Sequence, residues 1–363
     1  MPIRQRFDRL LLGSTILLTA IGLAILASAS WLLATERYGR PGSYFFTWQA
    51  ATAMVGLGLM VVNMHLKTSL LTDRRLVIGS FTAGWILMLA AFAQAPVAAT
   101  HRWISVGGIS LQPSVLVRLA LIMLMAILLD EARRRGWPWE KLAVICGISL
   151  ATAAVIVIQP DLGTAALLAA ALGGMAFVAG MPLRLLAAPA SVGFAALAVA
   201  IITSPYRLAR VRAFFDPEFG TSAGWQSYQS LVAIGSGGLI GRGYGSGMQK
   251  LFFLPEPHTD FIFAITGEEL GLIGMLVLIV LAGVITWRGF VIAARLDNPQ
   301  RALLAFGITA AFALQSLVHM VVCLDLLPPK GIPLPLVSYG KTEMLVTLVS
   351  IGMLLNLSRE VKA

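Results

Sequence analysis

The residues best suited to chemistry lie in one polar segment, QKLFFLPEPHTDFIFAITGEELG, at residues 249–271. Asp260 in this segment directly precedes a long apolar run. Its carboxylate could cap the helix that begins there, or it could act as a general base toward a substrate hydroxyl. His258 lies two residues earlier and could orient a substrate or hydrogen-bond a diphosphate. On local chemistry alone, both interpretations of Asp260 stay open.

Two further carboxylates, Glu268 and Glu269, lie inside the apolar run that follows. A helical rise of about 1.5 Å per residue places them roughly 12–14 Å deeper than Asp260. Glu268 lies about 80° around the helix from Asp260, and Glu269 faces nearly the other way, so we expect Glu268 to stay nearer the substrate side. Carboxylates at this depth must be paired, neutral or hydrated.

The elements that position these residues are membrane-spanning helices. The chain is 58% hydrophobic and 12% charged, and its apolar runs have the roughly 20 residues that a helix needs to cross a bilayer. We predict an all-α polytopic membrane protein, one domain over residues 1–363, with about ten spans. The first run is too long for the core of a signal peptide, and Cys146 and Cys323 lie in apolar runs where packing is their expected role. The predicted spans are about 10–33, 44–63, 76–95, 114–130, 142–159, 164–180, 185–203, 260–287, 302–325 and 341–357.

The basic residues orient this bundle. Sixteen of the 27 Lys and Arg fall on the side of the two termini, ten on the opposite side, and Arg118 within a span. Positive charge near span ends marks the cytoplasmic face, so both termini are expected in the cytoplasm. The long connection at about 204–259, between the seventh and eighth spans, then lies outside the membrane. Its aromatic residues lead us to expect an ordered loop.

This outer loop is cationic, which cytoplasmic anchoring does not explain. Arginine forks and lysine ammonium groups suit a phosphate or diphosphate, whereas nucleic acid is a poor partner on this face. The glycine-rich stretch 235–247 could bring backbone N–H groups to an anion, or could serve as a turn or a close helix contact. The five cations of the loop are Arg207, Arg210, Arg212, Arg242 and Lys250.

Three more polar clusters fall on the outer side. Arg102 and Trp103 combine a cation with a ring that suits the membrane interface, so they could either anchor the chain or bind substrate. Asp161 lies in a Gln-Pro-Asp turn between two spans. The proline-rich segment PPKGIPLPLVSYGK, at 328–341, is too polar to span and is expected to form an outer or re-entrant segment.

These clusters together resemble the SEDS family of membrane proteins (shape, elongation, division and sporulation). QPDLGTA, GWQSYQSLVAIGSGG, QKLFFLPEPHTDFIFAITGEELG and PKGIPLPLVSYG match the family in the same order, across nearly the whole chain. The forms GSGG, QKLFFLPEPHTDF and PPKG are more similar to the division branch, FtsW, than to the elongation branch, RodA.

The resemblance implies a peptidoglycan glycosyltransferase of the bacterial cytoplasmic membrane that polymerises lipid II on the outer face. Asp260 takes the position of the family's essential aspartate and would deprotonate the acceptor sugar. A class B penicillin-binding protein is the implied partner, with other divisome or elongasome membrane proteins, and a divalent cation, Mg²⁺ or Mn²⁺, could neutralise the leaving group. The implied substrate-binding residues are Arg102, Trp103, Arg210, Arg212, Gln249, Lys250, Glu256, His258, Lys330 and Ser338, with Arg118, Asp161, Glu268 and Glu269 in or near the cavity.

Four positions depart from the family pattern. Val115 replaces the glutamate of a QPSE motif, which leaves Arg118 without its usual local partner. We predict that Glu268, Glu269 or Asp161 lies within ion-pair distance of Arg118. The other departures are His319 for an asparagine, Asp325 for a glycine, and Lys341-Thr342-Glu343 in a SYGGSS motif; we expect Lys341, Glu343 and Asp325 to form a local charge network.

Three other functions share some of these features. A transporter or lipid II flippase would use the cationic site without needing Asp260 as a base, although no inverted repeat or paired broken helices are evident in the sequence. An inactive scaffold would recruit a penicillin-binding protein and tolerate loss of Asp260. A polymerase of another lipid-linked polysaccharide is the fourth alternative.

Overall fold

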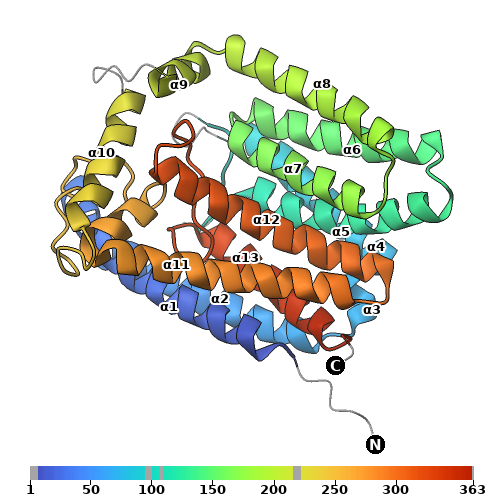
Figure 1. Ribbon diagram of the computed structural model, residues 1–363, viewed down its shortest axis with the longest axis horizontal. Coiled ribbons are helices and arrows are strands. Elements are labelled where there is room, and N and C mark those ends of the chain that lie inside the picture. The colour runs from blue at the N-terminus through green and yellow to red at the C-terminus, as the bar shows by residue number, and fades with distance from the viewer. Residues whose placement is uncertain (1–6, 95–99, 107–108, 216–221, 362–363) are drawn as a thin grey trace, which may run out of the picture.

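The computed structural model describes residues 7–94, 100–106, 109–215 and 222–361, and in them long helices run side by side (Figure 1). Each of the ten predicted spans coincides with a helix. Seven of these helices, α1, α2, α4, α6, α8, α11 and α12, are long and apolar enough to cross a membrane, whereas α7 is apolar but shorter. The helices are α1 (Arg9–Leu32), α2 (Tyr44–His65), α4 (Arg74–Ala90), α5 (Pro113–Arg134), α6 (Trp139–Ile158), α7 (Leu162–Val178), α8 (Leu183–Ile202), α11 (Ile262–Arg295), α12 (Pro299–Cys323) and α13 (Lys341–Ser358).

Polar residues begin several of these helices by accepting hydrogen bonds from the first, otherwise unpaired, backbone N–H groups. Asp8 accepts from Leu11 at the start of α1, and Asp73 accepts from the first turn of α4. Asp161 and Asn298 do the same for α7 and α12. The turn residues of the sequence therefore fix where these four apolar runs become helical.

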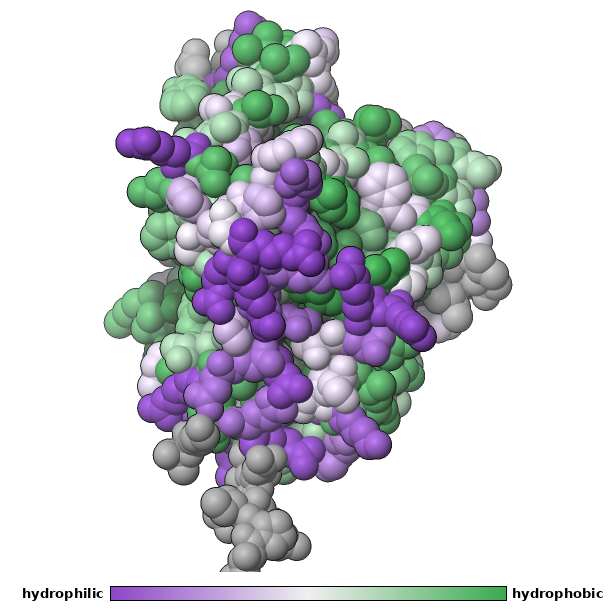
Figure 2. Space-filling model, turned by 90° about the vertical axis from the view of Figure 1, so that its right-hand side faces the viewer, coloured by the Kyte–Doolittle hydropathy of each residue, from purple (hydrophilic) through white to green (hydrophobic). Residues whose placement is uncertain are grey.

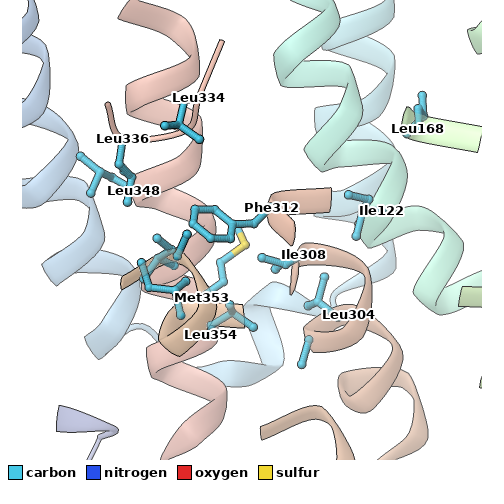
Figure 3. Close-up of a cluster of buried hydrophobic side chains, with 14 of the residues drawn as sticks. Ile122, Leu168, Leu304, Ile308, Phe312, Leu334, Leu336, Leu348, Met353 and Leu354 are labelled. Carbon is cyan, nitrogen blue, oxygen red and sulfur yellow. The ribbon is translucent and has the colours of Figure 1, made fainter. Parts of the chain in front are cut away.

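α12 and α13 lie in the middle of the molecule, with α1 and α2 along one side and α6, α7 and α8 along the other (Figure 1). α13 packs extensively against α2, and α11 packs against both α1 and α12. Side chains from α12 and α13, such as Phe312 and Met353, meet in a buried apolar cluster (Figure 3). Leu334 and Leu336, from the proline-rich segment before α13, belong to the same cluster, so this segment is anchored to the core.

The large outer loop is ordered in its described part and contains two helices, α9 (Pro205–Phe215) and α10 (Ser222–Gly237). α10 packs against α11 at one end of the molecule (Figure 1). Two short antiparallel strands, β1 (Ile104–Val106) and β2 (Ile109–Leu111), follow Arg102 and Trp103. The prediction of an all-α fold therefore omits one small hairpin, whose turn at 107–108 lies outside the described residues. The remaining short elements are α3 (Thr68–Leu71), a π-helical turn at Leu33–Arg37 and a 3-10 turn at Ala91–Ala93.

α11 is broken at Gly271, where the sequence predicted one continuous span. Gly271 adopts φ 65° and ψ −163°, a conformation open to glycine. The glycine-rich stretch fills the break: Arg242 and Gly243 donate N–H groups to the carbonyls of Glu268 and Glu269, at 3.0 Å each. On the other side of the break, Leu272 N–H donates to Gly238 O at 2.9 Å. The stretch therefore serves as a close helix contact, one of the two predicted alternatives.

The end of the bundle opposite α10 is strongly polar. Figure 2 shows hydrophilic side chains gathered in the middle of this face, with hydrophobic ones to either side. Both described chain ends lie here, because Asp8 N–H donates to Ser358 Oγ at 3.1 Å and Asp8 pairs with Arg288 at 2.6 Å. The predicted cytoplasmic cations Arg4, Arg6 and Lys362 lie outside the described residues. Other predicted cytoplasmic cations at this end include Arg74, Arg133, Arg134, Lys141 and Arg301.

Candidate active site

Asp260 lies just before α11 but does not cap it. The N-cap position is Phe261, which makes no side-chain cap hydrogen bond, so the capping interpretation of Asp260 is wrong. The backbone turns sharply before the helix, with the N–H of Asp260 donating to Glu256 O at 3.1 Å. The carboxylate of Asp260 therefore accepts no capping hydrogen bond from the first turn of α11.

The segment before α13 holds the backbone of the two residues that precede Asp260. Ser338 Oγ donates to Thr259 O at 2.6 Å, and Tyr339 N–H donates to His258 O at 2.9 Å. Gln49 of α2 holds this segment in turn, because its amide donates to Ser338 O at 3.0 Å and accepts from Gly340 N at 3.2 Å. Ser338, predicted to bind substrate, thus holds the loop that carries Asp260 in this structure.

Gly331 lies directly against the Asp260 carboxylate. A Cβ atom added at Gly331 would be 3.0 Å from Asp260 Oδ2 and 3.5 Å from its Cγ. A side chain at position 331 would therefore push the carboxylate aside. The close approach favours a residue without Cβ, and it joins the loop before α13 to the start of α11.

The surroundings of Asp260 tune it as a base. It keeps a partly exposed surface, yet burial of the carboxyl, followed by the negative charge of Glu256, raises its pKa to about 7. The positive charges of Arg210 and Arg102 oppose this rise. A general base is most effective when its pKa is close to the operating pH, so this carboxyl can accept a proton near neutral pH.

Arg102 and Arg210 lie close enough to the Asp260 carboxyl for their charges to act on it, and the charge of Arg210 acts in the same way on Lys330. Arg210 of α9 donates to Pro329 O at 2.9 Å, and Arg102 donates to Gln159 O at 2.7 Å and also to Pro160 O. Burial and the charge of Arg210 lower the pKa of Lys330, while Asp161 raises it. Arg102, Arg210 and Lys330 thus place positive charge where an anionic group could bind.

The structure assigns Glu268, Glu269 and Lys250 to a buried cluster inside the protein. Lys250 Nζ is 2.6 Å from Glu269 Oε1 and donates to Ser28 Oγ at 2.8 Å. Glu268 accepts from the backbone N–H groups of Met248 and Gln249, at 2.7 and 3.1–3.2 Å. Backbone N–H groups of the outer loop do bind an anion here, and that anion is the protein's own carboxylate.

Two consequences follow for the sequence predictions. Gly247 lies against both acids, because a Cβ there would be 2.9 Å from Glu268 Oε2 and 3.0 Å from Glu269 Oε1. The two acids thus meet at one glycine, and the expectation that Glu268 stays nearer the substrate side than Glu269 stays a prediction. The role of Lys250 as a diphosphate ligand stays a prediction, although its ammonium group already has three partners.

The predicted partner of Arg118 is also wrong. Arg118 Nη2 lies 2.6 Å from Glu343 of α13, and both side chains are largely buried. Glu343 of α13 thus supplies the negative charge that the glutamate of the QPSE motif would provide at position 115. The expected network of Lys341, Glu343 and Asp325 does not form, since Lys341 instead stacks over the Trp48 ring at 4.5 Å.

The remaining predicted residues surround the site at different depths. His258 is buried against Phe45 and Tyr339, and burial, followed by the charge of Arg37, lowers its pKa to about 4. Gln249 is buried as well, while Trp103 is partly exposed and Arg212 exposed. Glu256 pairs with Arg37 at 3.4 Å in an exposed contact.

The residues present do not form a ready-made metal site. Asp260 and Glu256 are near enough to interact, but across the described residues no group of three or more His, Cys, Asp or Glu side chains could hold a metal ion.

Sequence reasoning missed three residues that shape the site: Gln49, Gln315 and Gly331. Both glutamines are buried within apolar helices, and a polar side chain inside an apolar span was the available signal. Nothing in the sequence distinguishes Gly331 from the other loop glycines, because its role depends on how closely Asp260 approaches it.

The fold and the site define a class: polytopic helical membrane proteins with a carboxylate, flanked by cations, at one end of the bundle. The family model described as cell cycle protein, for FtsW, RodA and SpoVE, matches residues 8–363, and the chain belongs to this family. The predicted family is thereby confirmed.

Individual relatives agree with this assignment. The chain is 35% identical over 362 residues to the probable peptidoglycan glycosyltransferase FtsW of Geobacter sulfurreducens, covering 99% of this chain and 96% of the relative. It is 37% identical over 366 residues to the FtsW of the same description from Thioalkalivibrio sulfidiphilus, covering 98% and 90%.

Solved structures show the same fold. One, described as structural coordination of polymerization and crosslinking by a peptidoglycan synthase complex, has a TM-score of 0.78 at 26% identity, covering 97% of this chain and 98% of that one. The rod shape determining protein RodA of Thermus thermophilus has a TM-score of 0.69 at 25% identity, covering 98% of each chain.

Proposed function

We propose that this protein is a peptidoglycan glycosyltransferase that polymerises lipid II at the outer face of the bacterial cytoplasmic membrane, in septal synthesis during cell division. The observation that carries the proposal is the Asp260 carboxyl, not engaged as a helix cap, with a pKa raised to about 7 and with the charges of Arg102 and Arg210 acting on it. Relatives named as probable peptidoglycan glycosyltransferases FtsW support the activity and the division branch.

In the proposed reaction, Asp260 accepts the proton of the GlcNAc 4-hydroxyl of the acceptor. The freed oxygen attacks C1 of the donor MurNAc, and the bond from C1 to the diphosphate oxygen breaks. The electron pair leaves with the undecaprenyl diphosphate. The Asp260 carboxyl then returns its proton to solvent through its partly exposed surface.

The cations beside Asp260 have a matching role in this reaction. Arg102, Arg210 and Lys330 would bind the diphosphate of the donor and stabilise the negative charge that develops as it leaves. Burial lowers the pKa of Lys330, which reflects a poorly hydrated ammonium group. A poorly hydrated cation interacts more strongly with a phosphate than one in bulk water.

The topology proposed for this activity has ten spans, cytoplasmic termini and Asp260 outside. It is supported by the polar end that carries both described chain ends and by the placement of Asp260 toward the opposite end, with α9 and α10 (Figures 1 and 2). The proposed partner is a class B penicillin-binding protein, and the likeness to a component of a peptidoglycan synthase complex supports it.

A lipid II flippase is less consistent with the structure. Broken helices in transporters expose backbone groups that bind the substrate or the coupling ion. The break in α11 is filled instead by the loop 237–243, whose backbone satisfies both helix ends. The backbone groups freed by the break therefore hydrogen-bond the loop 237–243 and hold it in place.

The test is polymerisation of labelled lipid II by the purified protein in complex with its class B partner, for wild type and Asp260→Asn. Glycan ladders from wild type alone would support the proposal. Ladders from both proteins would remove Asp260 from the reaction, and ladders from neither, with the complex intact, would favour the scaffold.

A further inference from the structure

Gln315 of α12 joins the buried ion pair to the loop that carries Gly331. Its Oε1 atom accepts from Arg118 Nη1 at 2.5 Å, and its Nε2 atom donates to Pro333 O at 2.9 Å. Four residues later on the same helix, His319 Nδ1 contacts Ile332 O at 2.7 Å. Two neighbouring carbonyls of the loop are thus held from one face of α12.

The guanidinium of Arg118 determines which way the Gln315 amide points. A guanidinium can donate hydrogen bonds but cannot accept them, so Gln315 must present its oxygen to Arg118. The NH₂ group then faces the loop, where the carbonyl of Pro333 can only accept. Without Arg118, the Oε1 atom has no donor and the Gln315 side chain keeps only its bond to Pro333 O, which weakens the hold on the loop.

Glu343 keeps Arg118 in the position that this orientation needs. The two side chains are 12% and 9% exposed, so the pair is shielded from water. Thr347 donates to Glu343 Oε1 at 3.3 Å, which limits the rotation of the carboxylate. Val115, one turn before Arg118, offers no competing acceptor.

The loop that contains Ile332 and Pro333 also contacts the Asp260 carboxylate, through Gly331. Gly331 directly precedes the two anchored carbonyls, and a Cβ added to it would lie only 3.0 Å from Asp260 Oδ2. A shift of the Ile332–Pro333 backbone therefore moves the wall against which the Asp260 carboxyl rests. Because the same loop carries Lys330, its displacement would also move a cation of the proposed diphosphate site.

We propose that Arg118 is a positioning residue, acting through Gln315 and the Ile332–Pro333 carbonyls to place Gly331 and hence Asp260 for the reaction. This inference rests on the proposed function for its kinetic consequences. The arrangement itself rests on the contacts of Arg118, Gln315 and His319 alone.

The test separates positioning from helix packing. Replacing a buried ion pair by apolar residues of similar size is often neutral for stability, so Arg118→Met/Glu343→Met should fold while losing the orientation of Gln315. Gln315→Glu is the complementary variant, because it keeps a partner for Arg118 and loses the donor to Pro333 O. The matched control is Arg301→Met/Glu360→Met, which removes a 2.6 Å ion pair at the polar end.

Each variant is assayed in complex with its partner for lipid II polymerisation, for melting temperature, and for amide hydrogen exchange of residues 329–340. We expect both test variants to lower kcat about 10- to 100-fold, since misplacement by about 1 Å can cost a factor of 100. Arg118→Met/Glu343→Met should keep a melting temperature near that of wild type, whereas Gln315→Glu, which leaves two buried acids with one guanidinium, should melt at a lower temperature. KM should change less than about threefold, and exchange in the loop should become faster. The control should match wild type in all three.

Wild-type kcat in either Arg118→Met/Glu343→Met or Gln315→Glu would overturn the proposal, as would a matching loss of kcat in the control. If wild type itself makes no glycan, the proposed function fails, and hydrogen exchange then decides the positioning role alone. Unchanged exchange at 329–340 in both test variants would overturn it.

Discussion

Gly331→Ala tests the geometry of the active site with a single methyl group. The new Cβ would lie 3.0 Å from Asp260 Oδ2, whereas an ordinary contact begins at about 3.4 Å. The carboxylate must therefore move by about 0.4 Å. The backbone at Gly331 does not have the positive φ that excludes alanine, so the substitution acts through space alone.

The expected magnitude follows from that displacement. If 1 Å of misplacement costs about 100-fold in rate, 0.4 Å costs about five- to tenfold in kcat. KM for lipid II should change little, because Asp260 is not among the proposed diphosphate ligands. The free energy of unfolding should change by less than about 1.5 kcal/mol, since mild overpacking is partly offset by the lower entropy of the unfolded chain.

The assay is initial-rate polymerisation of lipid II by the complex with its partner, with Gly340→Ala as the matched control. A Cβ at Gly340 would meet its nearest neighbour, Glu343 Cβ, at an ordinary 3.4 Å. We expect wild-type kcat from the control. Equal kcat in wild type and Gly331→Ala would show that the Asp260 carboxyl is not constrained by this wall, and the reasoning would fail.

Three further predictions concern charge. Glu256→Gln removes a negative charge that raises the pKa of Asp260, so the low-pH loss of kcat, expected near pH 7 in wild type, should move to lower pH; a pH–rate profile that stays in place would contradict this. Lys250→Met leaves Glu269 buried without its cation and should lower the free energy of unfolding by about 3–5 kcal/mol, which Lys250→Met/Glu269→Met should largely restore in thermal unfolding. Lys330→Met should raise KM for lipid II by about tenfold or more, the value of a charge-assisted hydrogen bond to a phosphate, and an unchanged KM would exclude Lys330 from the diphosphate site.

The helices could be predicted because their signals are local. Each apolar run has the length of a span, and residues such as Asp73 and Asn298 mark where helices begin. The break at Gly271 could not be predicted in the same way. It depends on the loop 237–243 entering the gap, and one glycine in an apolar run is otherwise compatible with a continuous helix.

The candidate site was predicted only in part, because residue types can be read locally whereas contacts between helices cannot. Residue type identified Asp260 and the outer cations, but partners depend on which helices meet. Arg118 was expected to pair with acids of α7 or α11, and it pairs with Glu343 because α5 packs against α13. Lys250 was expected to bind a diphosphate, and its ion pair with Glu269 is a contact that the sequence did not indicate.

Because Arg118 pairs with Glu343, the residues that positions 115 and 343 can accept depend on each other, although the two positions lie far apart in the chain. A glutamate at position 115, as in the QPSE form of the motif, would lie one turn from Arg118 and compete with Glu343 for one guanidinium. Introduced alone, it would leave two buried acids sharing one cation; loss of Glu343 alone would leave the arginine with none. Positions 115 and 343 should therefore tolerate exchange together but not singly, and a chimaera that takes α5 from a relative must take α13 from the same source.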